Sequence, residues 1–372
     1  MSLAGQWVSR YSGTNSGKLV IDIDDLGDRY LGTACLWDDS PELPCSLVRF
    51  VLPSKDTKHT LNKLAVKPID HYGVELSDAT IAEFKVKGFL FPDTADVEIE
   101  LKGSDLYVSW MTSVGTSGTG MAVNLRKPGA ENSSLVPLRV NSWDDFKTHV
   151  NGLPERRYIF RGHARSHWKL RSSFYRTGRA NLERYLIEDV SQLQKQISGL
   201  TKHIYDLNNP LHYGAFANLV QHHGYPTPLL DWTWSPYIAA FFCYRNILKT
   251  ATPTADEKVR IYQFDVAAWN QLPQFNKLFP IQPHLSVLDA VAFDNSRVIP
   301  QQGISTVSNV DDLETYIAEV EGARARSYLS VLDLSAVQRN TVMKELALMG
   351  ITAASMFPGL DGACEALRER NF

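Results

Sequence analysis

The sequence predicts two unlike domains, an all-β barrel or sandwich followed by an α+β domain. Residues 1–128 contain short β-rich runs separated by turn signals, whereas residues 142–372 alternate between apolar strands and amphipathic helices. A polar segment, residues 129–141, links the two. The chain has 372 residues and is 44% hydrophobic, which provides enough apolar side chains for two cores.

The first domain is predicted from about eight β-rich runs at the spacing of antiparallel hairpins. A closed barrel or a sandwich would use this number of strands. Such a domain could bind a small ligand, bind a partner or serve as a packing module, and the sequence leaves these three open. The runs are residues 18–24, 29–37, 47–52, 61–69, 81–90, 95–101, 105–110 and 120–125.

Charge and composition narrow the class of protein. The net charge is -3 and the pI is near 6.4, so the whole chain carries no nucleic-acid signature. We expect a cytoplasmic protein without membrane contact, because no signal peptide or apolar run of transmembrane length is present. The cysteines lack CxxC spacing, which predicts reduced thiols and no zinc site; they are Cys35, Cys45, Cys243 and Cys364.

A basic stretch opens the second domain. Between Arg156 and Arg184, nine Arg or Lys residues stand against one acidic residue, Glu183. A local patch of this kind could contact a nucleic-acid or protein acceptor. The patch residues that we expect to make this contact are Arg165, Lys169, Arg171 and Arg176.

Arg161 and Gly162 stand where a short apolar strand ends. An arginine in this place could clamp a pyrophosphate, and a glycine lets a ligand approach the backbone. Equally, Arg161 could bond structural carboxylates or carbonyls. His163 and His167 are four residues apart, but a glycine-flanked turn is a poor helix and no Cys, Asp or Glu lies nearby, so we expect no metal there.

The segment from Gln221 to Cys243 places polar residues inside an apolar stretch. Glycine and prolines end a helix near His222, residues 229–234 form a short buried strand, and Ser235 with Pro236 starts a new helix. Asp231, Thr233 and Ser235 alternate, so they share one side of the strand. They could hold phosphate or ribose hydroxyls at the helix N-terminus, or merely cap the helix and tie the strand to it.

A later strand, residues 296–306, is interrupted at Pro300 and Gly303. Gln301 and Gln302 lie at the break, and alternation predicts that one amide faces inward and the other outward. His222 and His223 lie beside the Gln221–Cys243 segment and could act as an acid or base. Paired histidines before a glycine are as often hydrogen-bonding groups at a helix end.

Four motifs in this order resemble the FRG domain family, named for its Phe-Arg-Gly motif. They are Phe160–Gly162, Gln221–Phe242, Asn295–Gly303 and Met349–Gly362. The resemblance covers about 140–372 and implies little chemistry by itself.

Two of these segments also resemble motifs of ADP-ribosyltransferases of the Arg-Ser-Glu type. These enzymes use NAD as their substrate. The resemblance implies that Arg161 holds the pyrophosphate and that the Gly162 backbone binds the nicotinamide amide. Thr233 and Ser235 would support the nicotinamide ribose, with His222 beside them. The third motif departs from the family, because Gln301 and Gln302 stand where the catalytic glutamate is expected.

That departure leaves three outcomes open. A weak or differently built transferase could use these amides, or a carboxylate could come from elsewhere, such as Asp231 or Asp361. The remaining alternative is a non-catalytic nucleotide-binding sensor or interaction module. We expect a transferase-like enzyme, a bacterial toxin or antiphage effector that modifies nucleic acid or protein.

Overall fold

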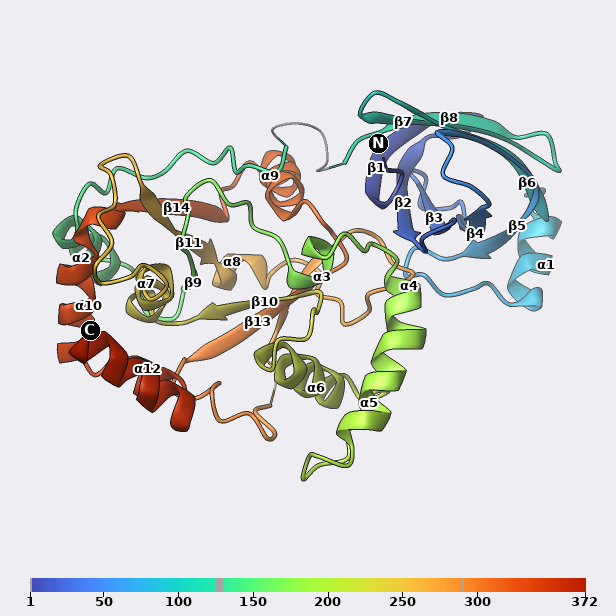
Figure 1. Cartoon of the computed structure of the whole chain (residues 1–372). Coiled ribbons are helices and arrows are strands. Elements are labelled where there is room, and N and C mark those ends of the chain that lie inside the picture. Colours follow the sequence, from blue (N-terminus) through green and yellow to red (C-terminus); the bar gives the residue numbers. More distant parts are fainter. Residues whose placement is uncertain (1, 125–129, 290) are drawn as a thin grey trace.

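The chain folds around two separate β-structures, an eight-stranded barrel and a six-stranded sheet (Figure 1). The computed structural model describes residues 2–124, 130–289 and 291–372. The end of the first predicted domain and the start of the linker, residues 125–129, lie outside the described residues. Within the described ranges, no helix has both the length and the apolar character that a membrane crossing requires.

The barrel is closed because β1 pairs with both β2 and β8, and every neighbouring pair is antiparallel. The prediction of an all-β first domain is therefore confirmed, with the barrel as its form. The strands are β1 Gly5–Gly13, β2 Gly17–Asp25, β3 Tyr30–Asp38, β4 Cys45–Leu52, β5 Lys58–Ile69, β6 Thr94–Lys102, β7 Asp105–Thr112 and β8 Ser117–Ala122.

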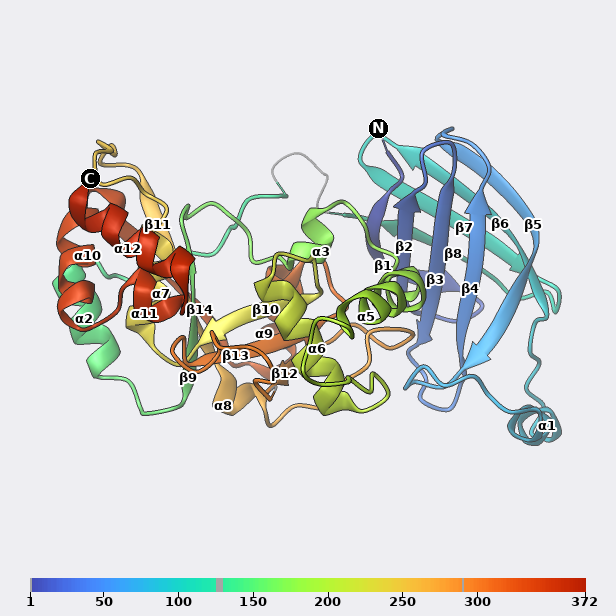
Figure 2. The ribbon, with the colours of Figure 1, turned by 60° about the horizontal axis from the view of Figure 1, so that its bottom comes forward.

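One of the strands predicted in the first domain is wrong. Residues 81–90 do not form a strand, because α1 (Asp78–Val86) occupies most of them. Ser77 caps this helix by accepting a hydrogen bond from the backbone of Thr80, and Asp78 stands in its first turn, where the helix dipole favours an acid. The helix buries none of its residues and lies outside the barrel (Figure 2). The strand that completes the barrel is β1 instead.

The second domain is mixed α/β, and its sheet is antiparallel throughout. The strand order is β12-β13-β10-β9-β11-β14, so strands distant in sequence become neighbours. The strands are β9 Tyr158–His163, β10 Leu229–Thr233, β11 Lys258–Asp265, β12 Leu285–Leu288, β13 Gly303–Ser308 and β14 Leu329–Ser335.

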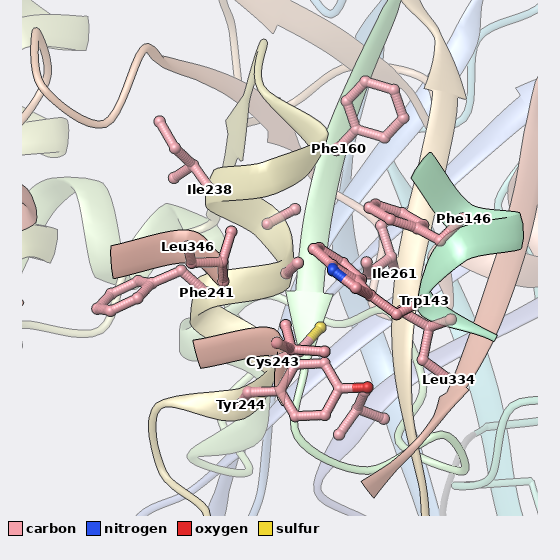
Figure 3. Packing of buried hydrophobic residues seen from close by; sticks show 14 of the residues in the cluster. Trp143, Phe146, Phe160, Ile238, Phe241, Cys243, Tyr244, Ile261, Leu334 and Leu346 are labelled. Atoms are coloured by element: carbon pink, nitrogen blue, oxygen red, sulfur yellow. The ribbon is translucent and has the colours of Figure 1, made fainter. Parts of the chain in front are cut away.

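Two groups of helices cover one face of this sheet. The first group packs on β9, β11 and β14 around a core that includes Trp143, Phe160 and Phe241 (Figure 3). It consists of α2 Trp143–Asn151, α7 Pro236–Tyr244, α10 Arg339–Leu348, α11 Ala353–Met356 and α12 Leu360–Asn371. The second group packs on β10 and β13, with Leu229 and Val307 in its core. It consists of α3 Ser173–Arg176, α4 Leu182–Arg184, the π-helix Tyr185–Val190, α5 Ser191–Ile197 and α6 Pro210–His222.

The opposite face of the sheet has a single core. Strand alternation turns Leu230 and Trp232 of β10 toward this face, where they pack with residues of α8 (Val266–Trp269) and α9 (Leu313–Arg324). The Asp231 and Thr233 side chains therefore point to the face that the two helix groups cover, at the boundary between those groups.

Buried polar groups join the barrel to the second domain. The Asp24 carboxylate of β2 accepts hydrogen bonds from the backbone N–H groups of Ala180 (2.8 Å) and Asn181 (3.0 Å). The Gln6 side chain of β1 donates to Asp22 (3.0 Å) and to the Asn309 carbonyl (2.8 Å). The segment around α3 and α4 is thus anchored on the barrel.

Candidate functional site

Strands β9 and β10 are neighbours that separate almost at once. They share one residue pair, Thr233 with Phe160, whereas β9 pairs with β11 from Tyr158 to His163. The Arg161 side chain reaches across the resulting opening, and its Nη1 donates a hydrogen bond to the backbone carbonyl of Asp231. The structure thereby brings together two of the residues that the sequence singled out.

Arg161 is held from its own strand by His163. The Arg161 Nε lies 3.2 Å from His163 Nε2, and His163 Nδ1 lies 3.4 Å from the Trp168 carbonyl oxygen. Burial, reinforced by the Arg161 charge, lowers the pKa of His163 to about 3, so its imidazole is neutral. The geometry then requires that Nδ1–H donates to Trp168 and that Nε2 accepts from Arg161. His163 is therefore a positioning group for the guanidinium.

Part of the Arg161 guanidinium has no partner. Its Nε and Nη1 make the two hydrogen bonds described above, and Nη2 makes none with the described residues. Burial lowers the pKa of Arg161, and the charge of Asp231 opposes this shift. The N–H groups of Nη2 are therefore free to donate to an anionic oxygen such as that of a phosphate.

Arg176, the last residue of α3, has a guanidinium whose charge interacts with those of Arg161 and Asp231. Burial and the positive charges of Arg161 and Arg171 lower the pKa of Arg176 to about 10, while Asp231 raises it. Among the described residues, no carboxylate forms an ion pair with Arg176 or Arg161. Two neighbouring cations without paired acids form a local site for an anion.

The rest of the basic patch is balanced by acids. Arg165 pairs with Glu257 (2.5 Å), and Lys169 pairs with Asp312 (2.7 Å). Arg171 makes two hydrogen bonds with Asp311, one of them at 2.7 Å. The sequence showed the excess of basic residues, but these acids lie 90 or more residues away along the chain. Arg176 is the patch residue that contributes an unbalanced charge.

Asp231 carries a carboxylate oxygen that is buried without a hydrogen-bond donor. Its Oδ1 has no such partner among the described residues, although the charge lies close to Arg161 and Arg176. In the strand register, Asp231 stands opposite Ser305 of β13. A buried acceptor left without a donor costs about 1–3 kcal/mol, so a ligand that supplies a hydroxyl here would gain that amount.

A chain of amides continues from Ser305 to His222. Asn218 Nδ2 donates to Ser305 Oγ (2.7 Å), and Asn295 Nδ2 donates to Asn218 Oδ1 (2.7 Å). His222 Nδ1 lies 2.9 Å from Asn295 Oδ1, so Nδ1 carries the proton and donates. The Nε2 atom of His222 makes no hydrogen bond with a described residue. The neighbouring His223 is exposed at the C-cap of α6.

The sequence reasoning missed Asn218, Asn295 and Ser305. One signal was available, since Asn218 interrupts the apolar run Gly214–Val220, all of which is buried. A buried amide inside such a run needs partners, and these proved to be polar groups of the site.

Thr233 and Ser235 have structural partners. Thr233 Oγ1 donates to the Gln301 carbonyl (2.8 Å) and accepts from the Ser235 backbone N–H (3.1 Å). The Ser235 side chain caps α7 by accepting from Ile238 N–H (3.3 Å). Ser235 therefore has the capping role that the sequence suggested as one alternative. A ligand-binding role for Thr233 or Ser235 stays a prediction.

One glutamine is buried and the other is exposed, as predicted, but the predicted strand 296–306 is wrong in its first part, because both glutamines lie in a turn and β13 begins at Gly303. Gln301 is buried and its Nε2 donates to the Met356 carbonyl (2.9 Å), whereas Gln302 is exposed, with a positive φ of 47°. Gln301 thereby ties the start of β13 to the C-terminal segment. Asp361, the other carboxylate considered, is exposed in the first turn of α12.

Gly162 is required by packing. A Cβ atom at this position would lie 2.1 Å from the Ala239 carbonyl oxygen of α7 and 2.8 Å from Cys243 Sγ. The glycine lets the helix that follows Ser235 lie directly on β9. This close contact holds the middle and the end of α7 against β9.

Comparisons with known proteins address parts of this picture. Residues 156–252 match the FRG domain family. The matched FRG region contains Arg161, Arg176, Asn218, His222 and Asp231. No curated protein matches the chain. One similar solved structure is a redesigned β-barrel, with 10% identity over 33% of this chain and 90% of its own, and a TM-score of 0.22.

Proposed function

We propose that the second domain is an ADP-ribosyltransferase-like enzyme with NAD as its substrate. The observation that carries the proposal is that Arg161 and Arg176, which form no ion pair with a described residue, lie within electrostatic range of Asp231, whose buried Oδ1 has no hydrogen-bond donor among the described residues. The two segments that resemble transferase motifs also support it, because they lie on the neighbouring strands β9 and β10, with Gln301 and Gln302 directly before β13, the next strand beside β10.

In this proposal the guanidiniums bind the pyrophosphate of NAD. Arg161 offers Nη2, whose orientation His163 fixes, and Arg176 supplies a second charge from the end of α3. The opening between β9 and β10 gives the nucleotide access to the backbone beside Gly162. Thr233 and Ser235 would support the ribose at the N-terminus of α7.

The carboxylate that the glutamine pair lacks would come from Asp231. Cleavage of the bond between ribose C1′ and the nicotinamide nitrogen sends the bonding electrons to nicotinamide, which leaves neutral, and the ribosyl centre becomes an oxocarbenium ion. Asp231 stabilises this positive charge and accepts a hydrogen bond from a ribose hydroxyl. It then takes the proton of the acceptor as the acceptor's lone pair bonds to C1′.

The proposed acceptor is a protein rather than a nucleic acid. Ion pairs with Glu257, Asp312 and Asp311 offset Arg165, Lys169 and Arg171, which leaves the patch little net charge for a polyanion. A nucleic-acid acceptor would reveal itself by transfer that weakens steeply as salt is added. Modification of a host or phage component would suit a toxin or an antiphage effector.

A nucleotide sensor without turnover is the second candidate. Gln301 and Gln302 favour it, since an amide carries no charge and cannot accept the proton. The sensor would use Arg161 and Arg176 for the same pyrophosphate. The two candidates therefore predict the same binding and differ in nicotinamide release.

The test measures nicotinamide release from NAD by the purified chain, with and without cell lysate. It compares the wild type with Arg161→Ala. We expect release in the wild type and a loss of at least about 100-fold in the variant, comparable to removing a preorganised electrostatic group. Arg165→Ala is the matched control, because it removes an exposed guanidinium of the same patch.

The outcomes separate the candidates. Release that Arg165→Ala preserves and Arg161→Ala abolishes supports the enzyme. NAD binding by calorimetry without release identifies the sensor, and release or binding that is equal in both variants contradicts the site.

A further inference from the structure

We propose that the barrel is a receptor for a small neutral apolar molecule, a single ring carrying one hydrogen-bonding group. The ligand would lie in a cavity of about 180 Å³ enclosed by β1–β8 and the loops at one end. This inference concerns the first domain alone, so it does not depend on the NAD site.

The interior of the barrel is packed at one end and hollow at the other. Trp7, Leu52 and Leu106 are fully buried, and none of them lines the cavity. Trp7 Nε1 donates to the Leu3 carbonyl (2.8 Å), which closes that end. Folded interiors are usually packed to the density of organic crystals. A cavity confined to one half of the barrel departs from this packing, and we infer that it serves a ligand.

Small side chains keep the hollow half open. Ala34 of β3 and Ala95 of β6 both line the cavity, at inward positions where larger apolar residues would fill it. Gly118 of β8 lies against the Trp110 indole, since a Cβ there would be 2.3 Å from Trp110 Cζ2. The wall thus combines large rings with small residues and leaves a defined space.

The wall chemistry indicates a neutral ligand. Most of the lining is apolar or aromatic, and the phenol of Tyr11 lies edge-on to Trp110 with ring centroids 5.5 Å apart. Tyr11 donates to the Asp38 carboxylate (3.2 Å), and burial raises the pKa of Tyr11, so the phenol keeps its proton. A carboxylate ligand would meet the Asp38 charge, whereas a neutral hydroxyl could bond both groups.

An aromatic segment covers the open end. Phe89 and Phe91, which connect α1 to β6, both line the cavity, and each ring contacts Phe84 of α1 edge-on. The helix itself buries no residue. A segment attached to so weakly packed a helix can move aside with little loss of buried surface, which gives the ligand an entry path.

The cavity size sets the class of ligand. An apolar cavity of about 150 Å³ stays dry and admits benzene, and the present cavity of about 180 Å³ is slightly larger. Toluene and p-cresol have the same ring and methyl group, and only p-cresol has a hydroxyl. They are therefore suitable probes of volume and of the polar end separately.

The experiment measures toluene and p-cresol binding to the full chain by calorimetry, with thermal melting as a second readout. We expect both to bind the wild type. Ala34→Phe fills the cavity and should weaken both by at least about 100-fold. Ala65→Phe, at an exposed position on β5 beside cavity-lining Leu64 and Val66, should change neither.

Tyr11→Phe tests the polar end. We expect p-cresol to lose roughly tenfold in affinity, because one buried hydrogen bond is lost, and toluene to lose nothing. Absence of binding to the wild type, or binding that Ala34→Phe leaves intact in a folded variant, would overturn the proposal. A loss that is equal for both probes in Tyr11→Phe would contradict the proposed orientation.

Discussion

The binding sites that we propose in the barrel and in the second domain are of opposite kinds. The proposed barrel site is an apolar cavity that the small side chains of Ala34 and Ala95 keep open. In the proposed site of the second domain, Arg161 and Arg176 have no ion-pair partner and Asp231 Oδ1 has no hydrogen-bond donor among the described residues. The difference shows that a ligand can be inferred either from an unfilled cavity or from polar groups that lack partners.

The largest stability effect should come from Gly162→Ala, which tests whether the second site depends on close packing. The new Cβ would meet the Ala239 backbone carbonyl, so α7 has to move. We expect a loss of about 3 kcal/mol in the free energy of unfolding, typical of overpacking. Urea unfolding measures it.

Gly199→Ala is the matched control, because a Cβ there meets nothing within 4 Å. It should leave the unfolding free energy unchanged. If the two variants are equally stable, the close contact at Gly162 is not what holds α7 against β9.

A smaller effect is expected at Asp22, where the two domains meet. Burial raises its pKa to about 8; the hydrogen bond from Gln6 opposes the shift, and the charges of Asp24 and Asp311 add to it. The native state therefore keeps a proton that the unfolded chain releases near pH 4, and stability should fall as the pH rises from about 4 to 8.

Asp22→Asn should remove this part of the pH dependence and stabilise the chain above pH 8. Melting temperatures at pH 5 and pH 8.5 measure the effect, with the exposed Asp28→Asn as control. If the pH profile of Asp22→Asn is the same as that of the wild type, Asp22 does not titrate in this pH range. The groups that join the two domains would then keep a fixed charge.

The sequence was sufficient for the general architecture. Alternating β-rich runs and turn signals predicted the all-β first domain, and the mixed second domain followed from its helix and strand pattern. Residues 81–90 were misread because Ile81, Phe84 and Phe89 suit a strand, while the Ser77 cap before them was overlooked. Closure through β1 and β8 depends on residues far apart in sequence, so no local pattern could reveal it.

Some residues of the candidate site were singled out from the sequence, whereas Asn218, Asn295 and Ser305 and the contacts between the residues were not. Arg161, Asp231 and Ser235 were all singled out, yet the partners of Arg161 on His163 and on the Asp231 backbone depend on strand order. The ion pairs that balance Arg165 and Lys169 come from distant segments. Which charges stay unpaired is a property of the folded chain, and this property decides where a ligand can bind.

The central claim, that Asp231 replaces the missing glutamate, is tested most directly by Asp231→Asn. Calorimetry with NAD and nicotinamide release would be measured on the same preparation. We predict that NAD affinity changes little while release falls by about 100- to 1,000-fold, because the amide keeps the shape and loses the charge. Release that persists at the wild-type rate in Asp231→Asn would contradict the account.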